Sequence, residues 1–311
     1  IFYAVLENDL RKVLSYSLIN QLGFMVCGIG IGTALALNGA VAHAFSHILY
    51  KSLLFMSMGA VLYRVGNIYA SDLGGLYKSM PKTTVLCIIG AASISALPLF
   101  SGFVSKSLVI TAQLDGGHTI VWLMLLFASA GVLHHAGIKV PFFAFFAHDS
   151  GIRTREAPLN MLIAMAIAAA LCVFIGTQPQ YLYAMLPWQM DYWPYDMTHV
   201  LAQLQLLFFA ALAFVWMEIK GYAPPELHAT NLDVDWFYRK LLPKTGRLVY
   251  RASRRLREGF DSVISSTLQG TQTLMRKTRF SDHYLTDWPT GSMVMWIAVI
   301  LGGYLLLDYI L

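Results

Sequence analysis

Three ionisable side chains recur at four-residue intervals inside one long apolar stretch. They are His43, His47 and Lys51, and this spacing places them in a row along one face of a helix. Groups about one turn apart can pass a proton along the row, directly or through one water molecule. The alternative is that they only form hydrogen bonds to neighbouring helices. We favour proton transfer for Lys51, because burying a charge at mid-bilayer costs about 2.5–3.5 kcal/mol and so requires a reason.

A fourth group follows an interruption in the next apolar stretch, residues 82–114. Pro98 and Gly102 lie in its middle, and proline removes a backbone donor and clashes with the preceding turn. We therefore expect a broken helix, whose unpaired backbone groups hold water or ions. Lys106, just beyond the break, would then have a polar setting in which it switches between charged and neutral forms. The alternative is that Lys106 extends towards the membrane surface from the end of a short helix.

A second cluster lies in residues 119–147, where His134 and His135 are at mid-depth and Lys139 is one turn beyond His135. Adjacent residues point to different faces of a helix, so at most one of the two histidines can face a given neighbour and bridge Lys51 to Lys106. Extension of Lys139 to the nearby membrane surface explains its position equally well. We discount a metal site, because the sequence places no carboxylate or thiolate beside this cluster.

The composition indicates a chain whose solvent is lipid. Of its 311 residues, 57% are hydrophobic and 13% are charged, against about 25% charged residues in soluble domains. A membrane-spanning helix needs about 20 apolar residues. The sequence thus predicts an all-α, polytopic membrane helix bundle with one discontinuous helix. The expected spans are residues 13–36, 40–63, 82–114, 119–147, 158–177, 199–219 and 290–311.

Positive charge is distributed unevenly across these spans. Of 22 Lys and Arg residues, 19 fall on the side that contains Arg11 and Lys12, and the other three lie within spans. By the positive-inside rule that side is cytoplasmic, which places segments 64–82, 148–157 and 220–289 in the cytoplasm. The opposite side would hold residues 36–39, 115–118 and the Tyr- and Trp-rich segment 178–198, which suits a membrane interface.

The C-terminal part differs in character from the rest. Apolar residues recur at near-helical spacing between Arg247 and Arg279 with arginines between them, which predicts a basic amphipathic helix on the cytoplasmic surface or along a neighbouring protein. We divide the chain into a transmembrane domain (1–220), a lateral-helix segment (221–289) and a terminal span (290–311). Because the chain starts at Ile1 with a short apolar stub, we expect it to begin within a helix and a further portion to precede it.

Four ordered motifs resemble a known family. The stretch from Asp9 to Phe24, DLRKVLSYSLINQLGF, is followed by HAFSHILYKSLLF from His43, DLGGL from Asp72 and LPLFSGFVSK from Leu97. Together they are similar to the antiporter-like membrane subunits of respiratory complex I and of Mrp-type Na⁺/H⁺ antiporters. Residues 131–158 are most similar to the D-type Mrp subunits. The basic lateral helix and final span resemble more the distal subunit of complex I.

The resemblance implies two inverted five-helix repeats, of which this chain would contain most of the second. It implies that Lys51, His43 and His47 match the relay residues and that Lys106 links to the outer half-channel. We expect a proton-translocating subunit of a Na⁺ or K⁺/H⁺ antiporter, with the membrane arm of NADH:quinone oxidoreductase or of a related hydrogenase as the alternative. A non-transporting membrane scaffold or receptor is the third possibility, and the buried lysines argue against it.

Partners follow from the same interpretation. We expect other subunits of a hetero-oligomeric membrane complex, protons, Na⁺ or K⁺ and lipid, and no nucleic acid. No flavin, iron–sulfur or nucleotide motif is present, so we expect no cofactor, no bound metal and no redox chemistry within the chain itself. Asp and Glu are missing from the centre of every span, which favours protons over a bare cation as the ion carried by this part.

Overall fold

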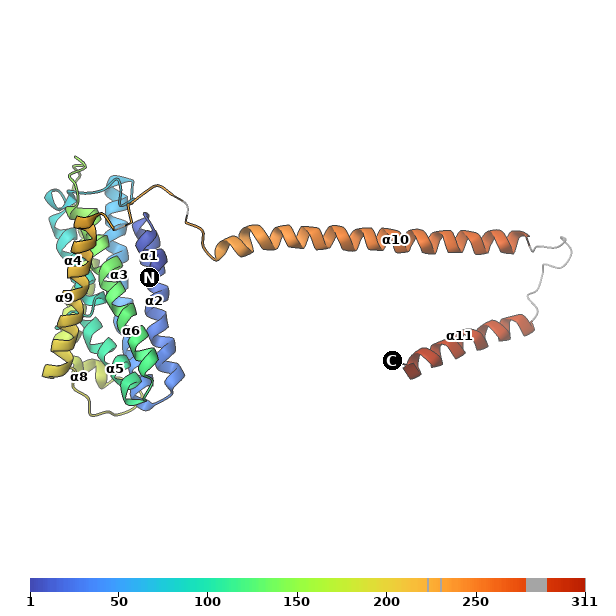
Figure 1. Ribbon diagram of the computed structural model, residues 1–311, viewed down its shortest axis with the longest axis horizontal. Helices are drawn as coiled ribbons and strands as arrows, with labels where there is room; N and C mark the ends of the chain where they lie inside the picture. Colours follow the sequence, from blue (N-terminus) through green and yellow to red (C-terminus); the bar gives the residue numbers. More distant parts are fainter. Residues whose placement is uncertain (223, 230, 278–289, 311) are drawn as a thin grey trace. The chain divides into compact units, whose positions relative to one another are not determined.

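The computed structural model describes residues 1–222, 224–229, 231–277 and 290–310, and Figure 1 shows their helices. Contacts divide the chain into two units, Ile1–Asp233 and Val234–Leu311. Regular structure in the described ranges is entirely helical, and an isolated bridge between Asp9 and Tyr69 is the nearest approach to a strand there. The fold class expected from the sequence is therefore confirmed.

The first unit is a bundle of helices that run side by side (Figure 1). In chain order its elements are α1 (Phe2–Leu6), α2 (Leu10–Ile31), α3 (Ala34–Val65), the 3₁₀ turn η1 (Leu76–Lys78), α4 (Pro81–Ile94), α5 (Ser101–Asp115), α6 (Thr119–Val132), the π-helical stretches η2 (Leu133–Lys139) and η3 (Phe142–Phe146), α7 (Leu159–Thr177), α8 (Pro179–Tyr183) and α9 (Met197–Lys220). Among the described residues, six helices are long and apolar enough to cross a membrane, by length and composition.

The central element is α3, which packs against α2, α4, α5 and α7. In an apolar 18-residue window of α3, 56% is buried, against 11% in the corresponding window of α9 at the edge of the bundle. Small residues permit this packing: a Cβ built on Gly39 would lie 3.0 Å from the backbone nitrogen of Val109 in α5. The row of ionisable residues on α3 is thus surrounded by other helices rather than by lipid.

The first inter-helix turn differs from the sequence expectation. Residues 36–39, expected to be a loop, lie inside α3, and the turn falls at Gly32 and Thr33 instead. Gly32 ends α2 with a φ of 75°, a left-handed conformation that glycine adopts without strain. The Thr33 side chain then accepts a hydrogen bond from the backbone N–H of Ala36, which caps α3. This glycine–threonine pair is a C-cap and N-cap signal that hydropathy alone does not detect.

The stretch 82–114 is two short helices, α4 and α5, separated by residues Ser95–Phe100. Ala96 and Leu99 in this connection have φ angles of 59° and 74°, positions that cost energy for residues with a Cβ. Gly102 lies in the first turn of α5, where an added Cβ would be 1.8 Å from the carbonyl oxygen of Ser93. The break is therefore held by close backbone packing around it.

A second irregularity lies in the apolar helix formed by α6, η2 and η3. Hydrogen bonding widens to the π pattern over Leu133–Lys139 and again over Phe142–Phe146. Pro141 separates the two stretches and lacks the N–H that a regular helix would use. The first π stretch contains His134, His135 and Lys139, and π-bulges in helices are frequent at functional sites.

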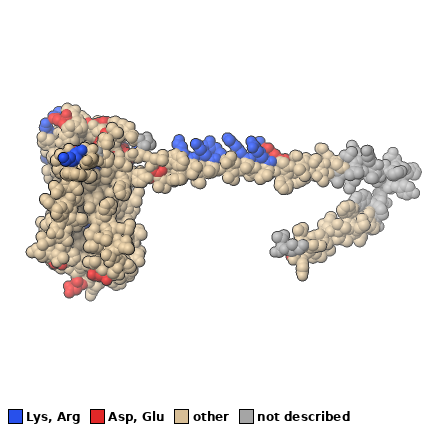
Figure 2. Space-filling model, in the orientation of Figure 1, with Lys and Arg blue, Asp and Glu red and all other residues tan. Residues whose placement is uncertain are grey.

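The second unit contains η4 (Phe237–Leu241), α10 (Leu242–Lys277) and α11 (Thr290–Ile310). Helix α10 has 36 residues, or about 54 Å at 1.5 Å per residue. Figure 2 shows its Lys and Arg side chains along one edge, as expected for a basic amphipathic helix. Helix α11 is one of the six membrane-length helices. The expected lateral-helix segment also included residues 278–289, which lie outside the described residues.

Candidate functional site

Lys51 lies on the inner face of α3 with 3% of its surface exposed. Its Nζ donates a hydrogen bond to the carbonyl oxygen of Leu14 in α2 at 2.8 Å. The ammonium also lies 5.9 Å from the centre of the Phe55 ring, within range of a cation–π interaction. Among the described residues it has no carboxylate within ion-pair distance, so its charge is balanced by dipoles and by an aromatic face.

His43 has hydrogen-bond partners on both ring nitrogens and is completely buried. Nδ1 lies 3.0 Å from Oγ of Ser105 in α5, and Nε2 lies 3.1 Å from Oε1 of Gln21 in α2. Tyr50 donates to the same Gln21 oxygen at 3.1 Å. His47 is 7% exposed, and its ring centre lies 6.4 Å from that of His43. The row on α3 therefore connects through His43 to α5, which also contains Lys106.

Lys106 is 1% exposed and lies across the helix break. Its Nζ donates to the carbonyl oxygen of Ile94, the last residue of α4, at 2.8 Å. A helix end presents unpaired carbonyls and partial negative charge, so α4 provides a site for the ammonium that a continuous helix would not. The Phe24 ring centre lies 5.3 Å from the same nitrogen.

The adjacent histidines of η2 point in different directions. His135 is fully buried, and neither ring nitrogen has a hydrogen-bond partner among the described residues. The ring of His134 instead packs against Phe214 of α9, with ring centres 4.8 Å apart. Only His135 thus faces the interior of the bundle, and the structure leaves it with unused hydrogen-bonding capacity.

Lys139 does not extend to the membrane surface. Its side chain is 2% exposed, and Nζ lies 2.7 Å from Oε1 of Glu226. The same nitrogen donates to the backbone carbonyls of Val5 and Glu7. The sequence pattern showed no carboxylate near this cluster, because Glu226 is far away in the chain and reaches Lys139 only through the fold.

A cavity of about 470 Å³ opens beside Lys106, between α5, α6 and α9. Thr111 and His199 also line it, and Nε2 of His199 lies 3.0 Å from Oγ1 of Thr111. Nδ1 of His199 is 2.7 Å from Oδ1 of Asp196, at ion-pair distance but outside hydrogen-bond geometry. His199 is 30% exposed, so this cavity extends from a buried lysine to a histidine near the surface. Sequence patterns did not single out His199, which lies at the very start of its span.

Other polar atoms inside the bundle have no hydrogen-bond partner among the described residues. Buried polar groups are normally satisfied by protein or by ordered water, so an unpaired group requires an explanation. Most of these atoms belong to the helices that surround the basic residues. On α2, α3, α5, α6 and η2 they come from Ser17, Asn20, Gln21, Ser46, His47, Gln113, Ser129 and His135.

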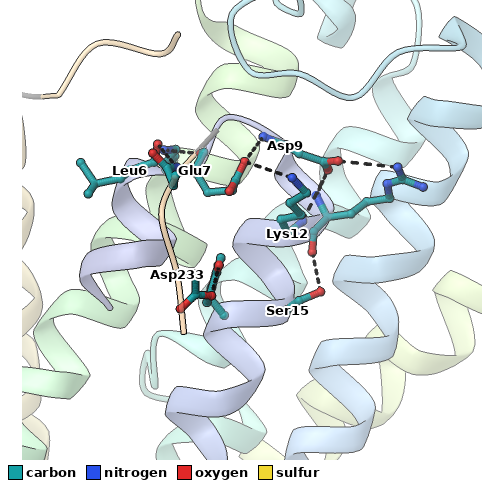
Figure 3. Close-up of polar contacts among 10 residues, drawn as sticks. Leu6, Glu7, Asp9, Lys12, Ser15 and Asp233 are labelled. Atoms are coloured by element: carbon teal, nitrogen blue, oxygen red, sulfur yellow. Dashed lines mark hydrogen bonds and ion pairs between the residues drawn. The ribbon is translucent and has the colours of Figure 1, made fainter. Parts of the chain in front are cut away.

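Apart from the buried lysines, charged residues of the first unit gather at the ends of the bundle, and Figure 2 shows Lys and Arg side chains at one end. At that end Asp9 caps α2 by accepting from the backbone N–H of Arg11 at 2.9 Å. Glu7 and Lys12 form an ion pair at 3.8 Å, which Figure 3 shows. The DLRK motif therefore serves as a helix cap and a charged rim.

A family comparison covers the part of the chain that contains most of these groups. Residues 2–134 match the family described as NADH:quinone oxidoreductase/Mrp antiporter, TM. This stretch, less than half of the chain, is similar to that family of antiporter-like membrane proteins. It includes α2 to α5 and thus the row on α3, the break and Lys106. The chain is a multi-pass integral membrane protein.

Individual relatives of the family come from different complexes. Hydrogenase-4 component B of Escherichia coli (strain K12) is 29% identical over 208 residues, which are 58% of this chain and 30% of that protein. The A-type Na(+)/H(+) antiporter subunit of Alkalihalophilus pseudofirmus is 30% identical over 206 residues, which are 58% of this chain and 26% of that protein. The chain spans less than a third of either relative.

The fold is also similar to that of a solved structure. A chain in the structure of the Mrp complex from Dietzia sp. DQ12-45-1b matches with a TM-score of 0.67 and 22% identity. The match covers 97% of this chain and 35% of that one. At this identity the likeness establishes the fold, an antiporter-like helix bundle with one discontinuous helix. It assigns no role to individual side chains.

Proposed function

We propose that this chain is a proton-translocating component of a multi-subunit membrane complex. The observation that supports it is the set of buried basic residues, Lys51, His43, His47 and Lys106, in the apolar interior of membrane helices. Ionisable groups at that depth are expensive and mark ion pathways in membrane proteins. The family match and relatives from hydrogenase and antiporter assemblies support the same proposal.

The proposed path begins at Lys139 and His135 on η2. It continues along Lys51, His47 and His43 on α3, and reaches Lys106 through Ser105. Steps without direct hydrogen bonds use water, for which the unpaired polar atoms along the interior provide partners. A positive charge on one lysine disfavours a charge on the next, so protons advance one step at a time. His199 and Thr111, in the cavity beside Lys106, are the proposed outlet.

We assign the parent assembly to an Mrp-type Na⁺ or K⁺/H⁺ antiporter, in which this chain takes the place of a D-type or an A-type component. The similarity to an A-type Na(+)/H(+) antiporter subunit supports this choice. The cation itself would bind elsewhere in the complex, because the centres of the described membrane spans contain no Asp or Glu. Neighbouring subunits would bury the apolar faces of α9 and α11.

A second candidate places the same path in a redox-driven pump. The similarity to hydrogenase-4 component B supports it, as does the family description. In that case electron transfer in other subunits drives proton movement, and this chain contributes only the path. In both assemblies segments 64–82, 148–157 and 220–289 lie on the cytoplasmic side of a bacterial inner membrane. Residues 1–220 then form the conducting domain, and residues 221–289 and 290–311 connect it to neighbouring subunits.

One experiment tests both the path and the driving reaction. Inverted vesicles that contain the complete complex are given an Na⁺ or K⁺ gradient, or an electron donor, and proton movement is followed with a pH-sensitive dye. A cation-driven signal abolished by Lys106→Ala and by Lys51→Ala supports the antiporter. A signal that needs NADH or another donor supports the redox pump. Undiminished proton movement in both variants would overturn the proposed path.

A further inference from the structure

A segment after α9 lies along one end of the first unit and contacts it at several points. Glu226 reaches Lys139 of η2, and Asn231 donates a hydrogen bond from Nδ2 to the carbonyl oxygen of Leu6 at 3.2 Å. The Tyr16 hydroxyl of α2 donates a hydrogen bond to Oδ2 of Asp233, which Figure 3 labels. These contacts are made by described residues on both sides of residue 230. They bring the carboxylate of Glu226 to Lys139, within the membrane-length helix Thr119–Phe146.

Glu226 and Lys139 form a buried pair. The Glu226 side chain is 11% exposed, and that of Lys139 is 2% exposed. Oε1 lies 2.7 Å from Nζ, whereas Oε2 is buried without a hydrogen-bond partner among the described residues. A charged carboxylate oxygen left unpaired in such a place is costly, and a proton on it removes most of that cost. The geometry therefore favours a carboxyl group that gains and loses a proton.

We propose that Glu226 is a further residue of the proton path, through which protons from the aqueous phase at this end of the bundle reach Lys139. This inference rests on the proposed function. The Glu226 side chain keeps 11% of its surface exposed, more than the 2% of Lys139, and its Oε1 contacts the lysine. No other Asp or Glu of the described residues lies within ion-pair distance of Lys139.

The proton is conserved in each step. In the resting pair Glu226 is a carboxylate and Lys139 an ammonium. Lys139 first gives a proton to the next acceptor of the path, with His135 one turn away on η2, and becomes a neutral amine. Glu226 then takes a proton from water and passes it to the amine along their 2.7 Å contact, which restores the pair. One proton has entered from the aqueous side and one has advanced into the bundle.

The electrostatic surroundings support this assignment. Burial raises the pKa of Glu226, the contact with Lys139 lowers it, and the nearby carboxylates Glu218 of α9 and Glu7 raise it. Glu7 is itself ion-paired to Lys12 of α2 at 3.8 Å. The net result is a raised pKa for Glu226, which allows proton uptake closer to neutral pH than an exposed glutamate would.

The test compares Glu226→Gln with wild type in vesicles that contain the complete complex. Initial rates of proton movement are measured while the pH on the side of Glu226 is varied over 5.5–9. The driving force is the cation gradient or the electron donor, whichever the vesicle experiment identifies. We expect Glu226→Gln to reduce the rate about tenfold or more. The variant should also lack the fall in rate that the wild type shows as the pH rises above the pKa of Glu226. Glu226→Asp retains a carboxylate and should restore part of the rate with a shifted pH profile.

Asn231→Ala is the matched control, because it removes a contact of the same segment without touching Lys139. It should keep the wild-type rate and pH profile. A wild-type rate and pH profile in Glu226→Gln would overturn the inference. An equal loss of rate in Asn231→Ala would also overturn it and would leave Glu226 with a role only in holding the segment after α9 in place. If Lys51→Ala also transports normally, the proposed function fails as well. If Lys51→Ala is inactive while Glu226→Gln is normal, only the inference on Glu226 fails.

Discussion

Lys106 donates a hydrogen bond across the helix break to the carbonyl oxygen of Ile94, 2.8 Å away. The two residues are twelve positions apart, and the interruption at Ser95–Phe100 brings them together. The C-terminal end of α4 thus stabilises the ammonium on α5. This relationship links the discontinuous helix directly to the chemistry proposed for Lys106.

Substitutions can separate the positive charge of Lys106 from its ability to release a proton. Arginine keeps the positive charge opposite α4, but it does not release a proton at any working pH. We expect Lys106→Arg to assemble normally and to slow proton movement about a hundredfold. Lys106→Met should lose both transport and the interaction with α4. Proton movement at the wild-type rate in the arginine variant would show that titration of Lys106 is not needed.

His199 offers a test of the outlet. Glutamine at this position keeps a polar group near Thr111 but cannot carry a proton at physiological pH. His199→Gln should reduce the rate of proton movement about tenfold. Phe209→Leu changes an apolar residue of the same cavity and serves as the control, with an expected rate near that of wild type. Equal rates in His199→Gln and Phe209→Leu would mean that protons leave the bundle by a route that does not use His199.

The close packing at the break predicts a stability effect. An alanine at position 102 would place its Cβ 1.8 Å from the Ser93 carbonyl oxygen, so the two half-helices must move apart. Overpacking of this kind costs about 1–3 kcal/mol, and we expect Gly102→Ala to lower the Tm of the detergent-solubilised chain by several degrees. Gly30→Ala is the control, because nothing lies within 4 Å of its added Cβ. Unchanged melting of the Gly102 variant would contradict this packing argument.

The loop after α3 predicts a pH effect outside the membrane. Hydrogen bonds from Asn67, Ser71 and His228 lower the pKa of Asp72 from 3.8 to about 2. A carboxylate with a lowered folded-state pKa contributes stability that is fully present above pH 3.8 and is lost as the pH falls through about 2. Asp72 is partly exposed, so we expect a local effect rather than unfolding of the bundle.

Hydrogen exchange can detect that effect. Protection factors of residues 66–76, corrected for intrinsic exchange, should stay constant from pH 7 to pH 4 and fall towards pH 2. Asp72→Asn should show lower protection already at pH 7, because the amide is a weaker acceptor for His228. Constant protection down to pH 2 in the wild type would contradict the prediction.

The helices and their approximate places follow from the amino-acid sequence alone. Long apolar runs must become helices in lipid, because no water is available for their backbone groups. Pro98 and Gly102 predicted the break, and the four-residue spacing of His43, His47 and Lys51 predicted their common face, which is buried in the structure. The turn at Gly32–Thr33 was misplaced, because capping depends on side-chain hydrogen bonds that hydropathy does not record.

Which groups meet depends on the tertiary structure. Glu226 lies 87 positions from Lys139, and His199 lies 88 from Thr111, yet each pair is within 3.0 Å. No local pattern links such residues, since their contact depends on how α9 and the loop after it pack against η2 and α5. The same applies to the two histidines of η2. Periodicity showed that they diverge, but packing was needed to place His135 in the interior and His134 against Phe214.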